Sequence, residues 1–516
     1  MNGSEDPEPW WNKALVAALA GLLFSLVMSA LFSLGSAFRI APLVAVERAG
    51  IDFGMMAYTA FSGRPQQTTD DPRYVFVDVD RAACEAFSEA PEACVGGRPI
   101  PPALTVAFAR AVRGSGASVV LIDVRAPEDE EERARLADAM TATDGPWMIA
   151  SLGVRPRRST RQMEVVAEPE TLLGPSDRAA LRRGRLVLAP FVTSTDAFAA
   201  DGIIRHYPLL EQVHGLGGAA EPRGLPSAPF LAASLTDPAN AEAILCRYYA
   251  ETGDTCASSG RPGATADIRF GERTDMRNRI FYSLPSLAAA GAEQGRVYRD
   301  RYLGFYDRID ASALLDGDGF SWPPELMQGA VVVLGTSAPE GHDWHVTPVG
   351  PMAGPEILLN AIRAFSEYSP LSEPSVTATA GERFAAAWRG FAIKVGAMTS
   401  GTLIMLVGWF AIFWISDCWT AAPRWVRQAA CVTIFLVILL VTAMYELFSG
   451  IASLERNAQV SEATDLLTPL LALGLEGFAE AARTFAQASE ALVAWALARG
   501  LTMARTLNRS ASDEVA

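Results

Sequence analysis

The stretch PPALTVAFARAVRGSGASVVLIDV, residues 101–124, predicts a helix joined to a strand through a glycine turn. Its first half places Leu104 and Phe108 on one helical face, and Gly114 follows where a helix C-terminus is expected. Its second half, residues 118–124, is a short run of β-branched and apolar residues that is typical of a buried strand. One unit of an α/β fold is therefore visible in a single stretch.

Similar elements precede and follow this unit. The run RYVFVDVD (73–80) predicts a strand before it, and the charged helix 128–140 and the strand WMIASLG (147–153) come after it. Strand and helix then alternate, which implies a parallel sheet with right-handed crossovers. Further strands are expected at RLVLAPF (185–191), ADIRFG (266–271) and GAVVVLGTS (329–337), and a closing helix at GPEILLNAIRAF (354–365). The predicted fold class is α/β, with a doubly wound, mostly parallel sheet.

Apolar segments flank this sheet region. The chain has 516 residues, half of them hydrophobic, and a mean hydropathy of +0.18, which is high for a soluble protein. Charge-free stretches predict transmembrane helices at 14–38, 393–416 and 428–448. Tryptophans near their ends are typical of the membrane interface. The residues before the first segment are acidic rather than basic, so we interpret it as an uncleaved anchor and not as a signal peptide.

The cysteines indicate which side of the membrane the sheet occupies. Cys84 with Cys94, and Cys246 with Cys256, form two local pairs in the large loop. Such pairing predicts disulfides and an oxidising compartment, although unpaired thiols remain an alternative. We therefore place residues 39–390 outside the cytoplasm. The remaining segments are a short cytoplasmic N-terminal tail (1–13), a cytoplasmic loop (417–427) and a C-terminal tail (449–516).

The charge balance excludes one class of partner. The formal net charge is −15 and no basic stripe occurs in the sequence. Binding to nucleic acid requires clustered Lys and Arg that neutralise phosphates, so we expect no nucleic-acid partner. The lipid bilayer is the partner that the apolar segments predict. The sequence indicates no cofactor.

Acidic residues end several of the predicted strands. Asp78 and Asp80 end the first run and Asp123 ends the second, while Asp343 and His345 follow the late strand. Ligands of open parallel sheets bind at the carboxyl ends of the strands. If these strands are neighbours, the five side chains meet at one edge and form a candidate ligand site. Solvated carboxylates with no ligand are the alternative.

The stretch GHDWHVTPVGPMAGPEILLNAIRAF, residues 341–365, has three possible interpretations. His342, Asp343 and His345 offer nitrogen and oxygen ligands to a metal ion, but their spacing is a weak metal signal. A metal-dependent hydrolase using the strand-end aspartates lacks the usual catalytic motifs. We favour a shaped turn, in which Gly350 and Gly354 permit positive φ and the helix begins at Pro355. We accordingly predict no metal site and no catalytic residue.

Several stretches in the same order resemble the CHASE2 domain, an extracytoplasmic sensory module of bacterial membrane receptors. They are YVFVDVD, LTVAFARAVRGSGASVVLIDVRAPE, DGIIRHYPLL (201–210), LPSL (284–287) and GAVVVLGTSAPEGHDWHVTPVGPMAGPEILLNAIRAF. The resemblance covers roughly residues 40–370, and the last stretch is the most specific.

The resemblance implies a sensor in the bacterial inner membrane that recognises a small-molecule or envelope signal and performs no chemistry on it. Asp343, His345, Thr347, Pro348 and Asn360 correspond to family motif positions, which adds Thr347 to the candidate ligand-binding residues. Receptors of this family usually carry a kinase or cyclase after the membrane segments. We find no such motif, so we expect no catalytic output domain. A purely structural subunit of an envelope complex is the further alternative.

The C-terminal tail predicts an amphipathic helix at about 471–507. Its apolar face includes Phe478, Phe485, Leu492 and Trp495. This face is suited to a partner helix or to a second copy of the chain. Packing on the sensory domain or on the membrane surface is the alternative.

Overall fold

The computed structural model divides the chain into two compact units. The α/β unit comprises Met55–Ala378 with Leu454–Ala463, and the helical unit comprises Met1–Gly54, Thr379–Ser453 and Thr464–Ala516. The structure describes only part of each unit. The described residues are most of 73–94, 100–152, 154–167, 185–191, 203–214, 223–245, 277–282, 306–338 and 343–367, with scattered residues of 12–56 and 380–445.

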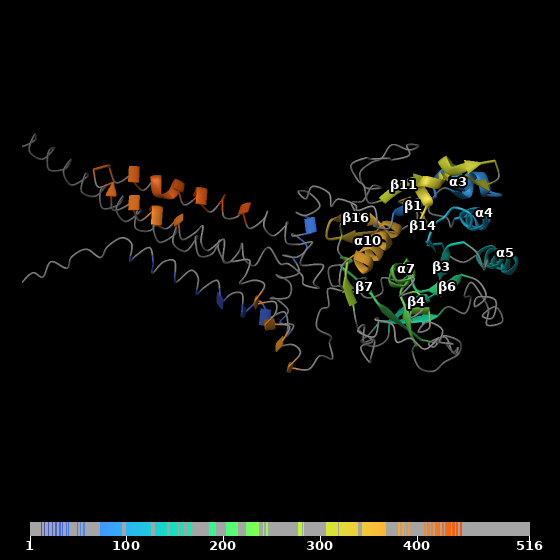
Figure 1. The fold of residues 1–516 in the computed structure, drawn as a ribbon, viewed down its shortest axis with the longest axis horizontal. Coiled ribbons are helices and arrows are strands. Elements are labelled where there is room, and N and C mark those ends of the chain that lie inside the picture. Colours follow the sequence, from blue (N-terminus) through green and yellow to red (C-terminus); the bar gives the residue numbers. More distant parts are fainter. Residues whose placement is uncertain are drawn as a thin grey trace, which may run out of the picture. The chain divides into compact units, whose positions relative to one another are not determined.

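A six-stranded parallel sheet forms the centre of the α/β unit (Figure 1). Its order is β11 (Tyr306–Asp310), β1 (Tyr74–Asp78), β14 (Val331–Gly335), β2 (Val119–Ile122), β3 (Trp147–Ser151) and β6 (Leu186–Ala189). Every pairing in this sheet is parallel. The predicted α/β class and parallel sheet are therefore confirmed.

Helices cover both faces of this sheet, as a doubly wound fold requires (Figure 1). One group is α3 (Arg81–Phe87), α4 (Pro102–Val112) and α5 (Glu130–Met140), and the other is α7 (Ala228–Thr236) and α10 (Gly354–Glu367). Every residue of β1, β2 and β14 is buried. Burial on two faces explains why these strands are continuous apolar runs and do not alternate with polar residues.

Local signals in the sequence set the helix ends. Pro102 is in the first turn of α4, where its missing N–H costs nothing. The Asp129 carboxylate accepts a hydrogen bond from the Glu132 N–H at 3.0 Å and so caps the N-terminus of α5. After α4, the Arg113 guanidinium donates to the Asp138 carbonyl at 2.9 Å, which ties the end of α4 to the end of α5.

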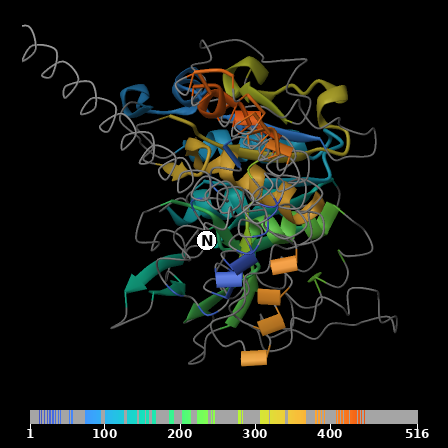
Figure 2. The ribbon, with the colours of Figure 1, turned by 90° about the vertical axis from the view of Figure 1, so that its left-hand side faces the viewer.

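A second, four-stranded sheet was not predicted from the sequence. It consists of β4 (Val154–Arg158), β5 (Met163–Ala167), β8 (Leu210–His214) and β9 (Arg223–Pro226). Figure 2 shows its teal and green strands at the lower side, away from the blue and yellow strands of the main sheet. Smaller elements are β7 (His206–Pro208), β10 (Arg277–Arg279), β12 (Leu315–Asp316), β13 (Gly319–Phe320), β15 (Trp344–Thr347), β16 (Gly350–Ala353), α9 (Pro324–Met327), η1 (Pro91–Cys94) and η5 (Ala311–Leu314).

The predicted disulfide between Cys84 and Cys94 is present, with their Cα atoms 5.8 Å apart. It links α3 to η1. The second predicted pair, Cys246 and Cys256, lies outside the described residues, as does the expected strand 266–271. Cys418 and Cys431 are free thiols.

The described part of the helical unit contains a pair of packed helices. A methyl group placed on Gly408 would lie 2.5 Å from Cδ1 of Ile438, so the two backbones approach closely at this glycine. Among the residues that the structure describes, none belongs to a helix with both the length and the apolar character of a membrane span. Only scattered residues of 14–38, 393–416 and 428–448 are described, and the predicted helix 471–507 lies outside the described residues.

Candidate functional site

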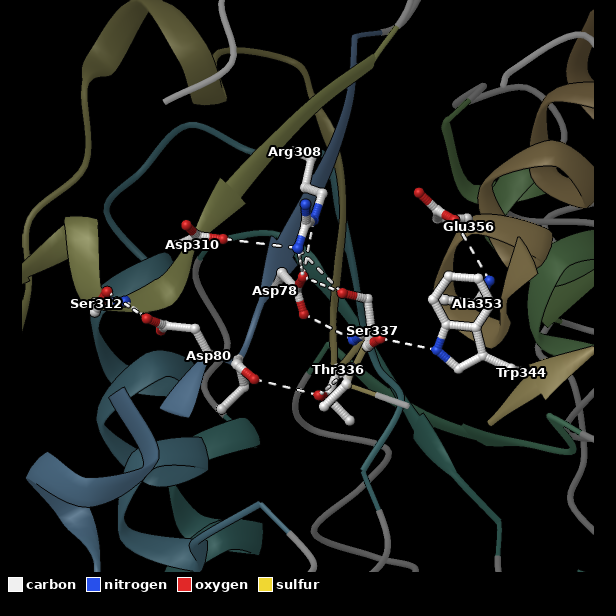
Figure 3. A network of polar contacts seen from close by, with 12 residues as sticks. Asp78, Asp80, Arg308, Asp310, Ser312, Thr336, Ser337, Trp344, Ala353 and Glu356 are labelled. Atoms are coloured by element: carbon white, nitrogen blue, oxygen red, sulfur yellow. Dashed lines mark hydrogen bonds and ion pairs between the residues drawn. The ribbon is translucent and has the colours of Figure 1, made fainter. Parts of the chain in front are cut away.

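Asp78 lies at the carboxyl end of β1, at the centre of a polar network shown in Figure 3. Its carboxylate accepts hydrogen bonds from the Ser337 backbone N–H at 2.7 Å and from Nε of Arg308 at 2.8 Å. The Ser337 hydroxyl and Nη2 of Arg308 also donate to it. Asp78 is only 2% exposed, so these donors replace the water that the carboxylate loses on folding.

The sheet register brings these groups together. Asp78 lies opposite Asp310 of β11 and Gly335 of β14, and Ser337 lies two residues after Gly335. Nη2 of Arg308 is 3.9 Å from the Asp310 carboxylate. Burial alone would lower the pKa of Arg308, but the charge and hydrogen bonds of Asp78, with Asp310 and Glu356, raise it above its usual value. The guanidinium therefore stays charged, and it forms an ion pair with the buried Asp78.

Asp80 has a separate partner. Its carboxylate accepts hydrogen bonds from the Ser312 backbone N–H at 3.0 Å and from the Ser312 hydroxyl at 2.6 Å. This contact anchors η5, which follows β11, to the end of β1 (Figure 3). The two predicted ligand residues Asp78 and Asp80 are thus both engaged by the protein itself.

Two further bonds extend from this edge of the sheet toward α10. Nε1 of Trp344 in β15 donates to the Ser337 carbonyl at 2.8 Å. In the first turn of α10, the Glu356 carboxylate accepts from the Ala353 N–H at 3.4 Å. Figure 3 shows Trp344 between Ser337 and α10. The hairpin of β15 and β16 therefore connects the sheet edge to the closing helix.

A second group of predicted residues meets at the start of α10. Oδ1 of Asp343 lies 3.0 Å from Nε2 of His345. A methyl group on Gly354 would overlap the Asp343 carboxylate, so this carboxylate lies directly against the first residue of α10. A methyl group on Gly335 would lie 2.5 Å from Cγ of Pro355 and 3.8 Å from Cβ of Asp123. Asp343 therefore contacts the first residue of α10, while Asp123 lies near Gly335, the strand residue that packs against Pro355.

The electrostatics of this group are unusual. Burial raises the pKa of Asp123 to about 8, and the negative charge of Asp343 contributes to the increase. Tyr207 of β7 is fully buried, and its hydroxyl donates to the Phe191 carbonyl at 2.6 Å. Burial raises its pKa well above the usual value, with contributions from Asp123, Glu211 and Asp343. At neutral pH this arrangement favours a protonated Asp123.

Thr347 and Asn360 have structural contacts. The Thr347 hydroxyl donates to the Gly350 carbonyl at 2.6 Å and accepts from the Val349 N–H at 3.3 Å, which closes the turn between β15 and β16. Nδ2 of the buried Asn360 donates to the Glu356 carbonyl at 3.0 Å. Of the two glycines that permit positive φ, Gly350 adopts it, at 117°. Gly354 does not adopt it; this glycine begins α10 and is needed because the Asp343 carboxylate packs against it.

Metal ligands are not grouped in the part of the chain that the structure describes. No cluster of three or more His, Cys, Asp or Glu side chains occurs there in a geometry suited to an ion. The described network also contains residues that the sequence did not single out, namely Arg308, Ser337 and Tyr207. Tyr207 lies within DGIIRHYPLL, which carried part of the resemblance, but Arg308 lies in a polar strand without such a signal.

Comparison with protein-family models gives one match. The model described as "CHASE2 domain" matches residues 23–406, which is most of the chain. Comparisons with curated proteins and with solved structures found no match.

Proposed function

The chain belongs to the CHASE2 domain family, and from this premise we propose that it is a membrane-anchored sensor whose α/β unit lies outside the cytoplasm. CHASE2 domains are extracellular sensory domains, so a sensory role follows from membership. The proposal depends mainly on the extent of the match. It begins within the predicted span 14–38 and ends within the predicted span 393–416, so it includes the sheet and both flanking apolar segments.

Exposed apolar side chains support the membrane anchor. Among the described residues, the most exposed large hydrophobic side chains are 38–63% exposed in the first apolar segment and 41–60% exposed in the last. They include Leu15, Leu19, Leu23, Val27, Leu31 and Leu34 in the first segment, and Val432, Leu436, Val437, Leu440 and Val441 in the last. Exposed apolar faces of this extent are typical of surfaces covered by lipid or by another protein. In this proposal a lipid bilayer surrounds the exposed apolar side chains of both segments.

The order of the elements supports a route for the signal. α10 is the last described element of the α/β unit, and the chain continues from it toward the predicted span 393–416. Its N-terminus contacts Asp343, so a change at the sheet edge acts first on this helix. A ligand shifts such an element only as far as it binds two conformations differently. In this proposal the chain acts through partner proteins and performs no catalysis of its own.

Two features support a binding role over a catalytic one. Asp78 and Asp80, which a hydrolase of this kind would use, hold Arg308, Ser337 and Ser312 in place. The predicted helix 471–507 in turn offers an apolar face to a partner or to a second copy. We place the protein in the bacterial inner membrane, with the α/β unit in the periplasm.

Reporter fusions test the topology. We expect a reporter active only outside the cytoplasm to work when fused after Arg48 or before Glu382, and to fail when fused at Ala421 in the loop 417–427. The loop fusion is the matched control, because it differs only in the number of preceding spans. An inactive reporter at Arg48 and Glu382, with activity at Ala421, would overturn the proposed location.

A partner test addresses the mode of action. We expect a full chain with Phe478, Phe485, Leu492 and Trp495 changed to Ser to lose binding partners, or its self-association, in cross-linked membranes. Substitution of Glu476, Arg483, Gln487 and Glu490 on the opposite face is the control and retains them. Equal loss in both variants, or in neither, contradicts a role for the apolar face.

A further inference from the structure

The helical stretch 380–392 carries large aromatic side chains that the rest of the chain leaves uncovered. All of its described residues are helical. Phe384 is 59% exposed and Trp388 is 62% exposed. The ring of Phe391 has its centroid 5.5 Å from that of Trp388. Because an α-helix turns by about 100° per residue, these three side chains lie within roughly 60° of one another, and we call them the aromatic face.

Another side of the same helix is packed. Ala387 is only 5% exposed, whereas Phe384 and Trp388 are among the most exposed large apolar side chains of the chain's described part. Contact within the chain therefore covers part of this helix and leaves the aromatic face open. Exposed apolar side chains that are contiguous on one face mark a surface that another molecule or a lipid layer covers.

The residues around the aromatic face indicate which cover fits. The chain as a whole has a net charge of −15, but the stretch 380–394 contains one acidic residue and three basic ones, namely Glu382, Arg383, Arg389 and Lys394. The predicted span 393–416 begins directly after the aromatic face. Aromatic rings beside a span are typical of the headgroup level of a bilayer. A second copy of the chain fits less well, because it would bring two sets of basic residues together.

We propose that the aromatic face of 380–392 binds an anionic phospholipid surface at the outer end of the span 393–416, with its rings among the headgroups and the nearby basic residues on lipid phosphates. This inference rests on the proposed membrane anchor and adds a lipid contact outside the predicted spans. It makes lipid composition an influence on the segment between α10 and the span.

The chemistry of both groups suits this position. The indole of Trp388 combines an apolar ring with an N–H donor, so it is stabilised where an apolar layer meets a polar one. In the proposed topology the basic residues lie outside the cytoplasm, where the general preference of Lys and Arg for the cytoplasmic side does not account for them. Anionic headgroups supply their counter-charge, and this attraction acts only close to the lipid surface.

Spin labelling of the full chain in lipid nanodiscs tests the contact. A nitroxide is attached at Ala385→Cys, an exposed position next to the aromatic face, in a background with Cys418→Ala and Cys431→Ala. The background protein without Ala385→Cys gives the blank. We expect the label to collide more often with oxygen, which concentrates in lipid, than with a water-soluble nickel chelate. Phe384→Ser with Trp388→Ser should abolish this preference for oxygen, and the conservative Trp388→Tyr should retain it.

Two reference labels separate this inference from the proposed membrane anchor. A label at Leu436→Cys, at a side chain that is 56% exposed in the last predicted span, reports lipid around the span. A label at Asp316→Cys, on an exposed residue of β12, reports water. If the label at 436 prefers oxygen while the label at 385 behaves like the label at 316, the inference is overturned and the anchor stands. If neither 436 nor 385 prefers oxygen, both fail. A label at 385 that neither reagent reaches would show a protein cover and would also overturn the inference.

Lipid composition tests the anionic partner. We expect the oxygen preference at residue 385 to increase when phosphatidylglycerol replaces part of the phosphatidylcholine. Arg383→Gln with Arg389→Gln should abolish this increase, because the lipid phosphates lose their counter-charge. Arg135→Gln, at an exposed arginine of α5, is the matched control and retains the increase. An oxygen preference that is the same in both lipid mixtures overturns the assignment of an anionic surface.

Discussion

At the scale of single residues, the carboxyl end of β1 shows how a buried charge is retained. The Asp78 carboxylate accepts one hydrogen bond from the Ser337 backbone N–H, one from the Ser337 hydroxyl and two from the Arg308 guanidinium. The Asp78 side chain is almost inaccessible to solvent. A buried ion pair is weak support for stability in itself, but removal of one partner leaves the other charge uncompensated. The network is therefore sensitive to single substitutions.

We expect Asp78→Ala to lower the free energy of unfolding of the α/β unit by about 3 kcal/mol, because Arg308 then loses its hydrogen-bonded partner and keeps only the weaker influence of Asp310, at 3.9 Å, and Glu356. Urea denaturation followed by circular dichroism measures the change. Asp316→Ala, an exposed carboxylate on β12, is the control and should change stability by less than about 0.5 kcal/mol. Equal effects of the two substitutions on the free energy of unfolding would show that the hydrogen bonds of Asp78 make no specific contribution to stability.

Asp123 makes the stability of the α/β unit depend on pH. Its pKa is about 8 in the folded protein and about 4 in an unfolded chain. Between these values the folded state holds a proton that the unfolded state has lost, so stability is highest below pH ~4 and falls as pH rises toward 8, by at most about 1.4 kcal/mol per unit. We expect Asp123→Asn to remove this decline in urea titrations at successive pH values. A variant with the wild-type slope would assign the decline to another group.

At the scale of elements, the sequence predicts what is buried and periodic. β1, β2, β3, β6 and β14 are apolar runs between turns, and α4, α5 and α10 have recognisable starts, so all eight lie where the sequence places them. β11 (YDRID) and β4 (VRPRR) are polar strands that resemble loops, and they were missed. The site residues were predictable to the same extent as the strands that carry them. Asp123 and Asp343 were expected at one edge because they follow predicted strands. Arg308 lies on β11, a strand that was missed, so the partner of Asp78 could not be inferred.

The start of α10 depends on a glycine. Ala is a better helix former than Gly by about 1 kcal/mol, but at position 354 its methyl group would lie 2.7 Å or less from both oxygens of Asp343. We therefore expect Gly354→Ala to destabilise the α/β unit by about 1–3 kcal/mol, measured by urea denaturation. Gly114→Ala, where no atom lies within 4 Å, is the control and should be close to neutral. In an Asp343→Ala background the cost of Gly354→Ala should disappear. Persistence of the cost would assign it to something other than this carboxylate.

The disulfide stabilises the pair formed by α3 and η1. Cys84 and Cys94 are separated by 10 residues in sequence, and closing a loop of this size reduces the entropy of the unfolded chain. We expect Cys84→Ala with Cys94→Ala to lower the free energy of unfolding by about 3 kcal/mol, and reductant to have the same effect on wild type. Cys418→Ala, at an exposed free thiol, is the control. Insensitivity of wild type to reductant would show that the bridge is absent in the protein as produced.

At the scale of the whole molecule, the chain consists of two compact units, and each has its own packing. In the helical unit, Ile438 atoms lie 2.5, 2.8 and 3.1 Å from where a methyl group on Gly408 would be, so a larger residue must push the two helices apart. The α/β unit has its own core around β1 and β14. Two units with separate cores are expected to open separately, so one unfolding free energy does not describe the chain.

We expect Gly408→Leu to increase hydrogen–deuterium exchange in residues 429–441 by roughly tenfold, since overpacking costs about 1–3 kcal/mol. Exchange in β1, residues 74–78, should stay within about twofold of wild type if the units open independently. Cys84→Ala with Cys94→Ala is the reciprocal variant and should change exchange around α3 without changing 429–441. If either variant alters both units equally, then the units open as one. In that case a signal at the sheet edge would reach the predicted membrane segments by changing the stability of the whole chain. A route through α10 alone requires that the α/β unit can change while the helical unit stays folded, so this route would be excluded.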